Sequence, residues 1–290
     1  MGGGSWTSAS YVTHSTTTRG FSSMDAFNSA STQDLYRSRK LEDCLNPYNV
    51  IRECCDSDEH PNTVPVILAL DVTGSMGSAA SAVAKQLGGI MSKLYESVTD
   101  VEFMTMAIGD LSYDSAPIQA SQFESDIRIA EQLEKVYFEA GGGGNQYESY
   151  TAAWFFGLYN TKLDCWNRGR KGIIITLGDE PLNPYLPKNA LSNTLGCSLQ
   201  SDVETEKLYE DVIQKFDVFH IAVDDSATGY RYYMSDIKSS FGKLLGDRLK
   251  VSTLQDLGPT ISSIIDECVN GNTSYNSDAK SDSDNDLISW

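Results

Sequence analysis

The sequence predicts an α/β fold in which helices cover both faces of a mainly parallel sheet. Short apolar runs rich in branched residues occur at 66–70 and 173–175, and such runs are typical of strands buried on both faces. Between them, apolar residues recur at three- and four-residue spacing over 83–98, as on one face of a helix. Strands and helices alternate in this way over 64–269, which favours parallel strands joined by helical crossovers.

The expected elements follow one another along residues 64–269. Strands are expected at 66–70, 101–108, 117–120 (a short edge strand), 171–177, 217–223 and 250–253. Helices are expected at 78–98, 124–136, 147–159, 203–216, 230–245 and 258–269. Gly88 and Gly89 weaken the first helix in isolation, but they permit a close approach between that helix and the sheet.

The remaining residues divide into three segments. Residues 1–40 are rich in Ser, Thr and Gly with single aromatics, and we expect a flexible or loosely docked arm. Residues 41–63 mix apolar and charged side chains and form an ordered lead-in to the domain at 64–269. Residues 270–290 are polar, acidic and repetitive in Ser and Asp, which predicts a disordered tail.

The charge of the chain limits its partners. The net charge is −18 and the pI about 4.4, which argues against binding nucleic acid or an anionic membrane through a basic field. The same balance suits solubility, cation binding or a basic partner. Met1 is not followed by a signal peptide pattern, and no apolar segment approaches the roughly 20 residues that span a bilayer. We expect a cytoplasmic chain whose six cysteines, including the adjacent Cys54 and Cys55, are reduced.

Oxygen-bearing side chains follow the two most apolar strands. Asp71, Thr73 and Ser75 come directly after the first strand, and Asp179 and Glu180 follow the strand at 171–177. A third polar loop, glycine-rich at 141–144, carries Asn145 and Glu148. Open α/β sheets bind ligands at the carboxyl ends of their strands, and hard divalent cations prefer oxygen ligands. The alternative is a polar loop in which Thr73 or Ser75 caps the next helix.

These three loops resemble the metal-ion-dependent adhesion site (MIDAS) of von Willebrand factor A (vWA) domains. DVTGSM at 71–76 matches the first motif, Asp-x-Ser/Thr-x-Ser, while GGGGNQYES at 141–149 and ITLGDEP at 175–181 resemble the second and third loops. The resemblance covers 64–269 and implies a doubly wound sheet of about six strands, one edge strand antiparallel, with Mg²⁺ or Mn²⁺ at its top.

The resemblance also implies roles for individual residues. Thr73 and Ser75 would bind the cation directly, and Asp71 and Asp179 directly or through water. Glu148 serves the second loop, with Asn145 as the alternative, because this loop lacks the threonine that many family members carry. One coordination position would stay open for an acidic side chain of a protein partner.

The resulting hypothesis is a non-catalytic, divalent-cation-dependent protein-binding module in an intracellular assembly. One alternative is a structural or assembly protein in which the cation only stabilises the fold. A Mg²⁺-dependent phosphohydrolase is disfavoured, because that class needs a second acid two residues after the first and position 73 is Thr. Asp110 and Asp114 could form an adjacent cation site, although a turn is the simpler interpretation. His220, within an apolar strand, is expected in the core.

Overall fold

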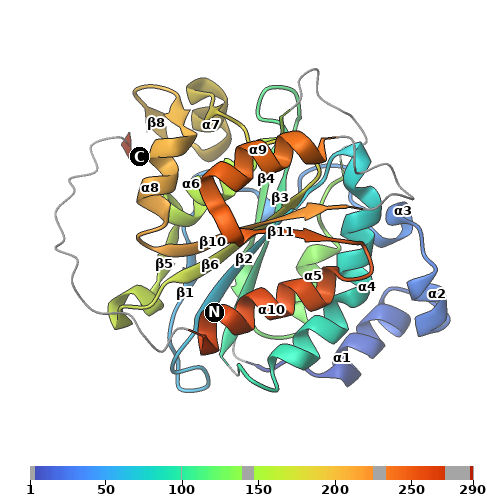
Figure 1. The fold of residues 1–290 in the computed structure, drawn as a ribbon. Helices are drawn as coiled ribbons and strands as arrows, with labels where there is room; N and C mark the ends of the chain where they lie inside the picture. Colours follow the sequence, from blue (N-terminus) through green and yellow to red (C-terminus); the bar gives the residue numbers. More distant parts are fainter. Residues whose placement is uncertain (1–3, 99, 139–146, 225–232, 272–287, 290) are drawn as a thin grey trace.

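A single six-stranded sheet forms the centre of the molecule (Figure 1). The computed structural model describes residues 4–98, 100–138, 147–224, 233–271 and 288–289. Across the sheet the order is β11 (Leu249–Ser252), β10 (Phe216–Val223), β6 (Gly172–Gly178), β2 (Val64–Asp71), β3 (Val101–Ile108) and β4 (Ile118–Glu124). Every neighbouring pair is parallel except β3–β4, which is antiparallel. The predicted mainly parallel sheet with an antiparallel edge strand is confirmed.

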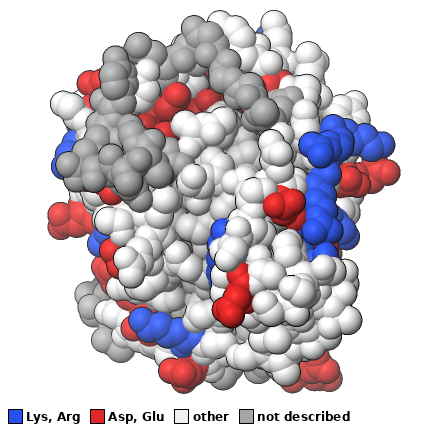
Figure 2. Space-filling model, turned by 90° about the vertical axis from the view of Figure 1, so that its right-hand side faces the viewer, with Lys and Arg blue, Asp and Glu red and all other residues white. Residues whose placement is uncertain are grey.

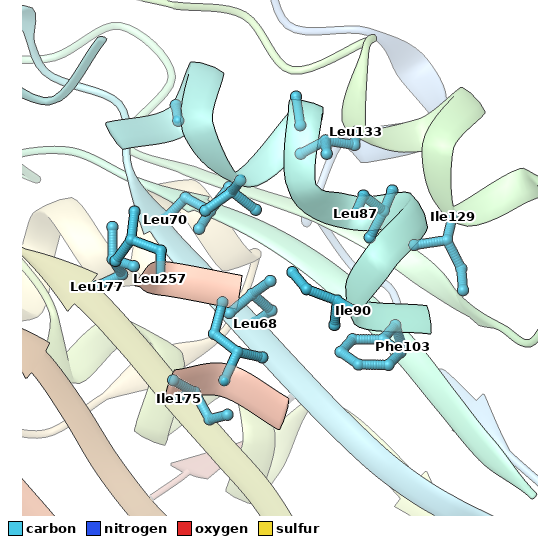
Figure 3. Close-up of a cluster of buried hydrophobic side chains, with 14 of the residues drawn as sticks. Leu68, Leu70, Leu87, Ile90, Phe103, Ile129, Leu133, Ile175, Leu177 and Leu257 are labelled. Atoms are coloured by element: carbon cyan, nitrogen blue, oxygen red, sulfur yellow. The ribbon is translucent and has the colours of Figure 1, made fainter. Parts of the chain in front are cut away.

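Helices cover both faces of this sheet, because successive side chains of each strand point to opposite sides. Leu68 and Leu70 of β2 pack with α4 (Gly77–Leu94), α5 (Arg128–Leu133) and α10 (Leu257–Asn270). Figure 3 shows this layer, in which Leu68, Leu70, Ile175 and Leu177 of the strands face Leu87 and Ile90 of α4 and Leu257 of α10. Ile67 and Ala69 point to the other face, towards α6 (Thr151–Tyr159), α8 (Thr205–Val212) and α9 (Met234–Leu245).

The amino-terminal segment, expected to be a flexible or loosely docked arm, is largely helical in the described structure. From residue 4 it forms α1 (Ser8–Thr13), a π-helical turn (His14–Thr18), α2 (Met24–Asn28) and α3 (Thr32–Leu35), which lie beside α4 (Figure 1). Its aromatic side chains join the core, and Tyr11 and Tyr36 donate hydrogen bonds to the Ala84 and Ala80 carbonyls at 2.8 and 2.9 Å. Burial of these rings offsets the entropy cost of ordering the segment.

Small strand pairs and short turns complete the fold. The pairs are β1 (Arg52–Cys54) with β5 (Thr161–Leu163), β7 (Tyr185–Leu186) with β9 (Val203–Glu204), and β8 (Ser198–Leu199) with β12 (Ile288–Ser289). Helix α7 (Lys188–Leu195) precedes β8, and 3-10 turns occupy Asp43–Leu45, Gly74–Met76, Asp164–Arg168 and Gly246–Arg248. No element was expected at 181–202, where β7 and β8 span two residues each and α7 spans only eight.

Several predicted boundaries were wrong. The helix expected at 124–136 covers only Arg128–Leu133, because β4 continues to Glu124 by pairing with Phe103 of β3. The helix expected from residue 147 begins at Thr151, since the backbone of Glu148 forms a parallel bridge with Leu182. The glycine-rich 141–144, Asn145 and residues 272–287 of the predicted tail lie outside the described residues. Among the described helices, none is both long and apolar enough to cross a membrane.

Candidate cation site at the carboxyl ends of two central strands

The neighbouring parallel strands β2 and β6 bring two of the polar loops together. Leu70 pairs with Leu177, so Asp71 lies level with Gly178 and the next residue of that strand end is Asp179. Because both strands run in the same direction, their carboxyl ends meet at one edge of the sheet. Asp71 is fully buried and Asp179 is 7% exposed, whereas Ser75 is exposed.

The hydroxyl groups of the first loop bind carboxylates. Thr73 donates to Asp71 Oδ1 from its backbone N at 2.9 Å and from Oγ1 at 2.6 Å. Ser75 Oγ donates to Asp179 Oδ1 at 3.2 Å, which links the loops after β2 and β6. Neither hydroxyl caps the following 3-10 turn or α4. The capping interpretation is therefore wrong for this loop.

The second loop brings Glu148 to the same edge of the sheet. Glu148 is 3% exposed, and its Oε2 is buried without a hydrogen-bond partner among the described residues, as are Asp110 Oδ2 and Glu180 Oε2. Ser149 holds the loop in place, because its backbone N donates to Gly109 O at 3.3 Å and its Oγ accepts from the Leu111 N at 3.0 Å. Asn145, the alternative ligand, lies outside the described residues.

The electrostatics of the site disfavour charge on the apoprotein. Burial, followed by the charge of Asp179, raises the pKa of Asp71 to about 7. Burial, followed by the charges of Asp71 and Glu180, raises the pKa of Glu148 to about 10. Burial also raises the pKa of Glu180 to about 8, with Asp71 and Asp179 adding to the effect, and it raises the pKa of Asp179.

Nothing in the described part of the chain neutralises these acids. No Lys, Arg or His there forms an ion pair with Asp71, Glu148, Asp179 or Glu180. Buried charges without a partner are costly. These carboxyl groups therefore either stay protonated or need a cation beside them when they are ionised.

Tyr150 is a central residue of the site that the sequence analysis missed. Its hydroxyl donates to Asp71 Oδ2 at 2.7 Å and accepts from the Glu180 backbone N at 3.3 Å. A Cβ at Gly178 would lie 2.1 Å from this hydroxyl, so only glycine leaves room for the ring. A glycine at the end of an otherwise branched strand is a signal of close approach, although it does not identify the approaching residue.

The donor atoms fit a hard cation only if the hydroxyls take part. Within the described ranges, no three or more His, Cys, Asp or Glu side chains are grouped to hold a metal ion. Hydroxyl oxygens have two lone pairs besides their proton, so Thr73 and Ser75 can donate to a carboxylate and still ligate a cation. Together with the unpartnered Glu148 oxygen, they provide the oxygen chemistry that Mg²⁺ and Mn²⁺ accept.

Two neighbouring features have structural roles. Asp110 and Asp114 form a turn, in which Asp114 Oδ2 accepts from Asp110 N at 2.7 Å and Asp110 Oδ1 accepts from Ser112 N at 2.7 Å. His220 lies in the core as expected, where Nδ1 is 2.8 Å from Thr176 Oγ1 and the ring stacks on Phe241. Burial lowers the pKa of His220 to about 3 and keeps it neutral.

Among known proteins, solved structures are the ones that resemble this chain. No family model and no curated protein matches the chain. One similar structure is the pilus adhesin SpaC from Lactobacillus rhamnosus GG (14% identity, TM-score 0.43, 72% of this chain and 31% of the adhesin). This chain thus spans about a third of the adhesin's length.

Two further matches are single domains. The vWF domain of the pilus tip protein Mfa5 from Porphyromonas gingivalis shows 10% identity, a TM-score of 0.40 and coverage of 74% of this chain and 98% of that one. The SpRpn10 VWA domain shows 12% identity, a TM-score of 0.39 and coverage of 67% and 93%. The six-stranded sheet with its antiparallel edge strand is what the sequence resemblance implied. The chain has a vWA-like fold.

Proposed function

We propose that this chain is a divalent-cation-dependent protein-binding module without catalytic activity. Mg²⁺ or Mn²⁺ would be held by Asp71, Thr73, Ser75, Glu148 and Asp179. The observation that carries the proposal is the cluster of buried carboxylates beside two hydroxyls, with no ion pair to a cationic side chain among the described residues. A cation supplies the positive charge that the cluster lacks.

The exposure of the first loop supports a role in binding. Gly74 and Ser75 are exposed while Asp71, Thr73 and Glu148 are buried, so the cluster reaches solvent at the Ser75 side. If the two neutral hydroxyls bind the cation directly and the carboxylates bind it partly through water, the cation is not fully neutralised on its solvent side. An acidic side chain of a protein partner is the group that would complete its coordination.

Two alternatives have different consequences. In a structural or assembly protein, the cation would only stabilise the fold, and partner binding would not depend on the cation. In a phosphohydrolase, position 73 would supply a general acid, but the Thr73 hydroxyl is not acidic enough for that role and donates a hydrogen bond to Asp71. The six cysteines carry free thiols, which suits the proposed intracellular location.

The decisive experiment is partner capture with immobilised protein, in Mg²⁺ and in chelator, read by mass spectrometry. Asp71→Asn removes one carboxylate charge with little change in shape, and Asp266→Asn makes the same change on the exposed side of α10. We expect a set of proteins that wild type and Asp266→Asn retain only with Mg²⁺, and that Asp71→Asn loses. The same set under every condition would refute cation-dependent binding.

A further inference from the structure

An open groove lies between the amino-terminal segment and the end of α5. Its volume is about 580 Å³, within the range typical of ligand sites. Four exposed cationic side chains line it, namely Arg37, Arg39, Lys40 and Lys135. Figure 2 shows Lys and Arg side chains gathered on the side of the molecule that carries the amino-terminal helices.

A partly buried ion pair and the contacts beside it fix the walls of this groove. Arg19 Nε lies 2.9 Å from Glu134 Oε2, and the Arg19 side chain is only 7% exposed. Arg19 also donates to the Leu35 carbonyl, and His14 Nε2 lies 3.3 Å from Glu134 Oε2. These contacts join the amino-terminal segment to α5, so the groove exists before any ligand arrives. They also pair Arg19 and Glu134 with each other.

Cationic side chains outnumber acidic ones in the groove lining, with Arg19, Arg37, Arg39, Lys40 and Lys135 against Glu42 and Glu134. In the described part of the chain, Arg39, Lys40 and Lys135 form no ion pair, and Arg37 donates to the backbone carbonyl of Asp34 at 2.9 Å. Glu42, the other acidic residue of the lining, accepts from Ser38 Oγ at 3.2 Å. This concentration of cations stands out in a chain with a net charge of −18.

The charge and openness of the groove indicate the class of ligand. Exposed ion pairs are individually weak, so a ligand must contact several cations at once. A nucleic acid would do so, but its charge continues beyond the groove over a strongly acidic molecule. We propose that the groove binds a short acidic peptide segment of a partner protein, independently of the cation site.

The test is fluorescence anisotropy with a labelled peptide in which Glu and Ser alternate, in metal-free buffer at low salt. The variant Arg39→Glu/Lys40→Glu reverses two groove charges. Its matched control, Lys207→Glu/Lys238→Glu, changes the net charge equally on exposed positions of α8 and α9, on the other face of the sheet. Circular dichroism verifies that both variants are folded.

We expect wild type and the control to bind within about twofold of each other, and the groove variant to bind at least about tenfold more weakly. A peptide with Gln in place of Glu should not bind. Absence of peptide binding by wild type, or equal weakening in both variants, overturns the proposal. Tighter binding of a single-stranded DNA oligonucleotide that shows the same variant pattern also overturns it. Because no metal is present, these outcomes leave the cation-site proposal unaffected.

Discussion

At the scale of single residues, Tyr150 determines how Asp71 is held. One carboxylate oxygen of Asp71 accepts two hydrogen bonds from Thr73, and the other accepts the Tyr150 hydroxyl. The carboxylate is thus fixed in orientation by both flanking loops. Its position does not depend on a bound cation.

Tyr150→Phe removes this donor and leaves a buried carboxylate oxygen unsatisfied. We expect the free energy of unfolding in metal-free buffer to fall by about 1–3 kcal/mol. Urea denaturation measures this, with Tyr209→Phe as control, because the described structure shows no hydrogen bond to the Tyr209 hydroxyl. The control should change stability by less than about 0.5 kcal/mol. Equal stability of both variants and wild type would show that the Tyr150–Asp71 bond contributes nothing.

The sequence could predict part of this residue-level picture. Asp71 and Asp179 were expected to meet, because each follows an apolar strand and parallel strands end at one edge. Tyr150 could not be predicted, because its role depends on where α6 begins and on the space left by Gly178. The ligand roles of Thr73, Ser75 and Glu148 remain predictions.

At the scale of elements, the contact between α1 and α4 revises the role of a glycine pair. Gly88 and Gly89 were expected to permit close approach to the sheet, yet a Cβ at Gly88 would lie 2.5 Å from Tyr11 Cε1, and one at Gly89 would meet no atom of the described residues within 4 Å. Tyr11 is 5% exposed and held by its bond to Ala84, so its ring has little freedom to move away. Gly88 therefore permits the amino-terminal segment to dock on α4.

This contact predicts opposite effects for two neighbouring substitutions. Gly89→Ala should raise the free energy of unfolding by up to about 1 kcal/mol, because alanine favours the helix. Gly88→Ala should lower it, since overpacking costs about 1–3 kcal/mol and exceeds the helical gain. Thermal or urea unfolding of the two variants provides the comparison. Stabilisation by both would mean that Tyr11 does not pack against α4.

The long elements were predictable and the short ones were not. Strands β2 and β6 and helix α4 extend over enough residues for their apolar pattern to be visible. The amino-terminal helices span four to six residues, less than two turns, and too short to show a pattern. Their stability comes from docking Tyr11, Phe27 and Tyr36 on a surface that only the folded chain provides.

At the scale of the whole molecule, the net charge is the sum of two different local environments, a buried acidic cluster and a basic groove. The acidic balance includes buried carboxylates at the carboxyl edge of the sheet, where burial raises the pKa values of Asp71 and Glu148. It also conceals a basic groove on the side of the amino-terminal helices. Sequence composition predicted cation binding or a basic partner, but it could not reveal a groove suited to an acidic one.

The most direct test of the central claim is isothermal titration calorimetry of Mg²⁺ into the metal-free protein. We expect binding to a single site in wild type and in Asp266→Asn, and loss of that binding in Asp71→Asn. Loss of one negative charge at this site leaves its hydroxyls in place, so the comparison isolates the carboxylate. Absence of Mg²⁺ binding by wild type, or undiminished binding by Asp71→Asn, would contradict the account.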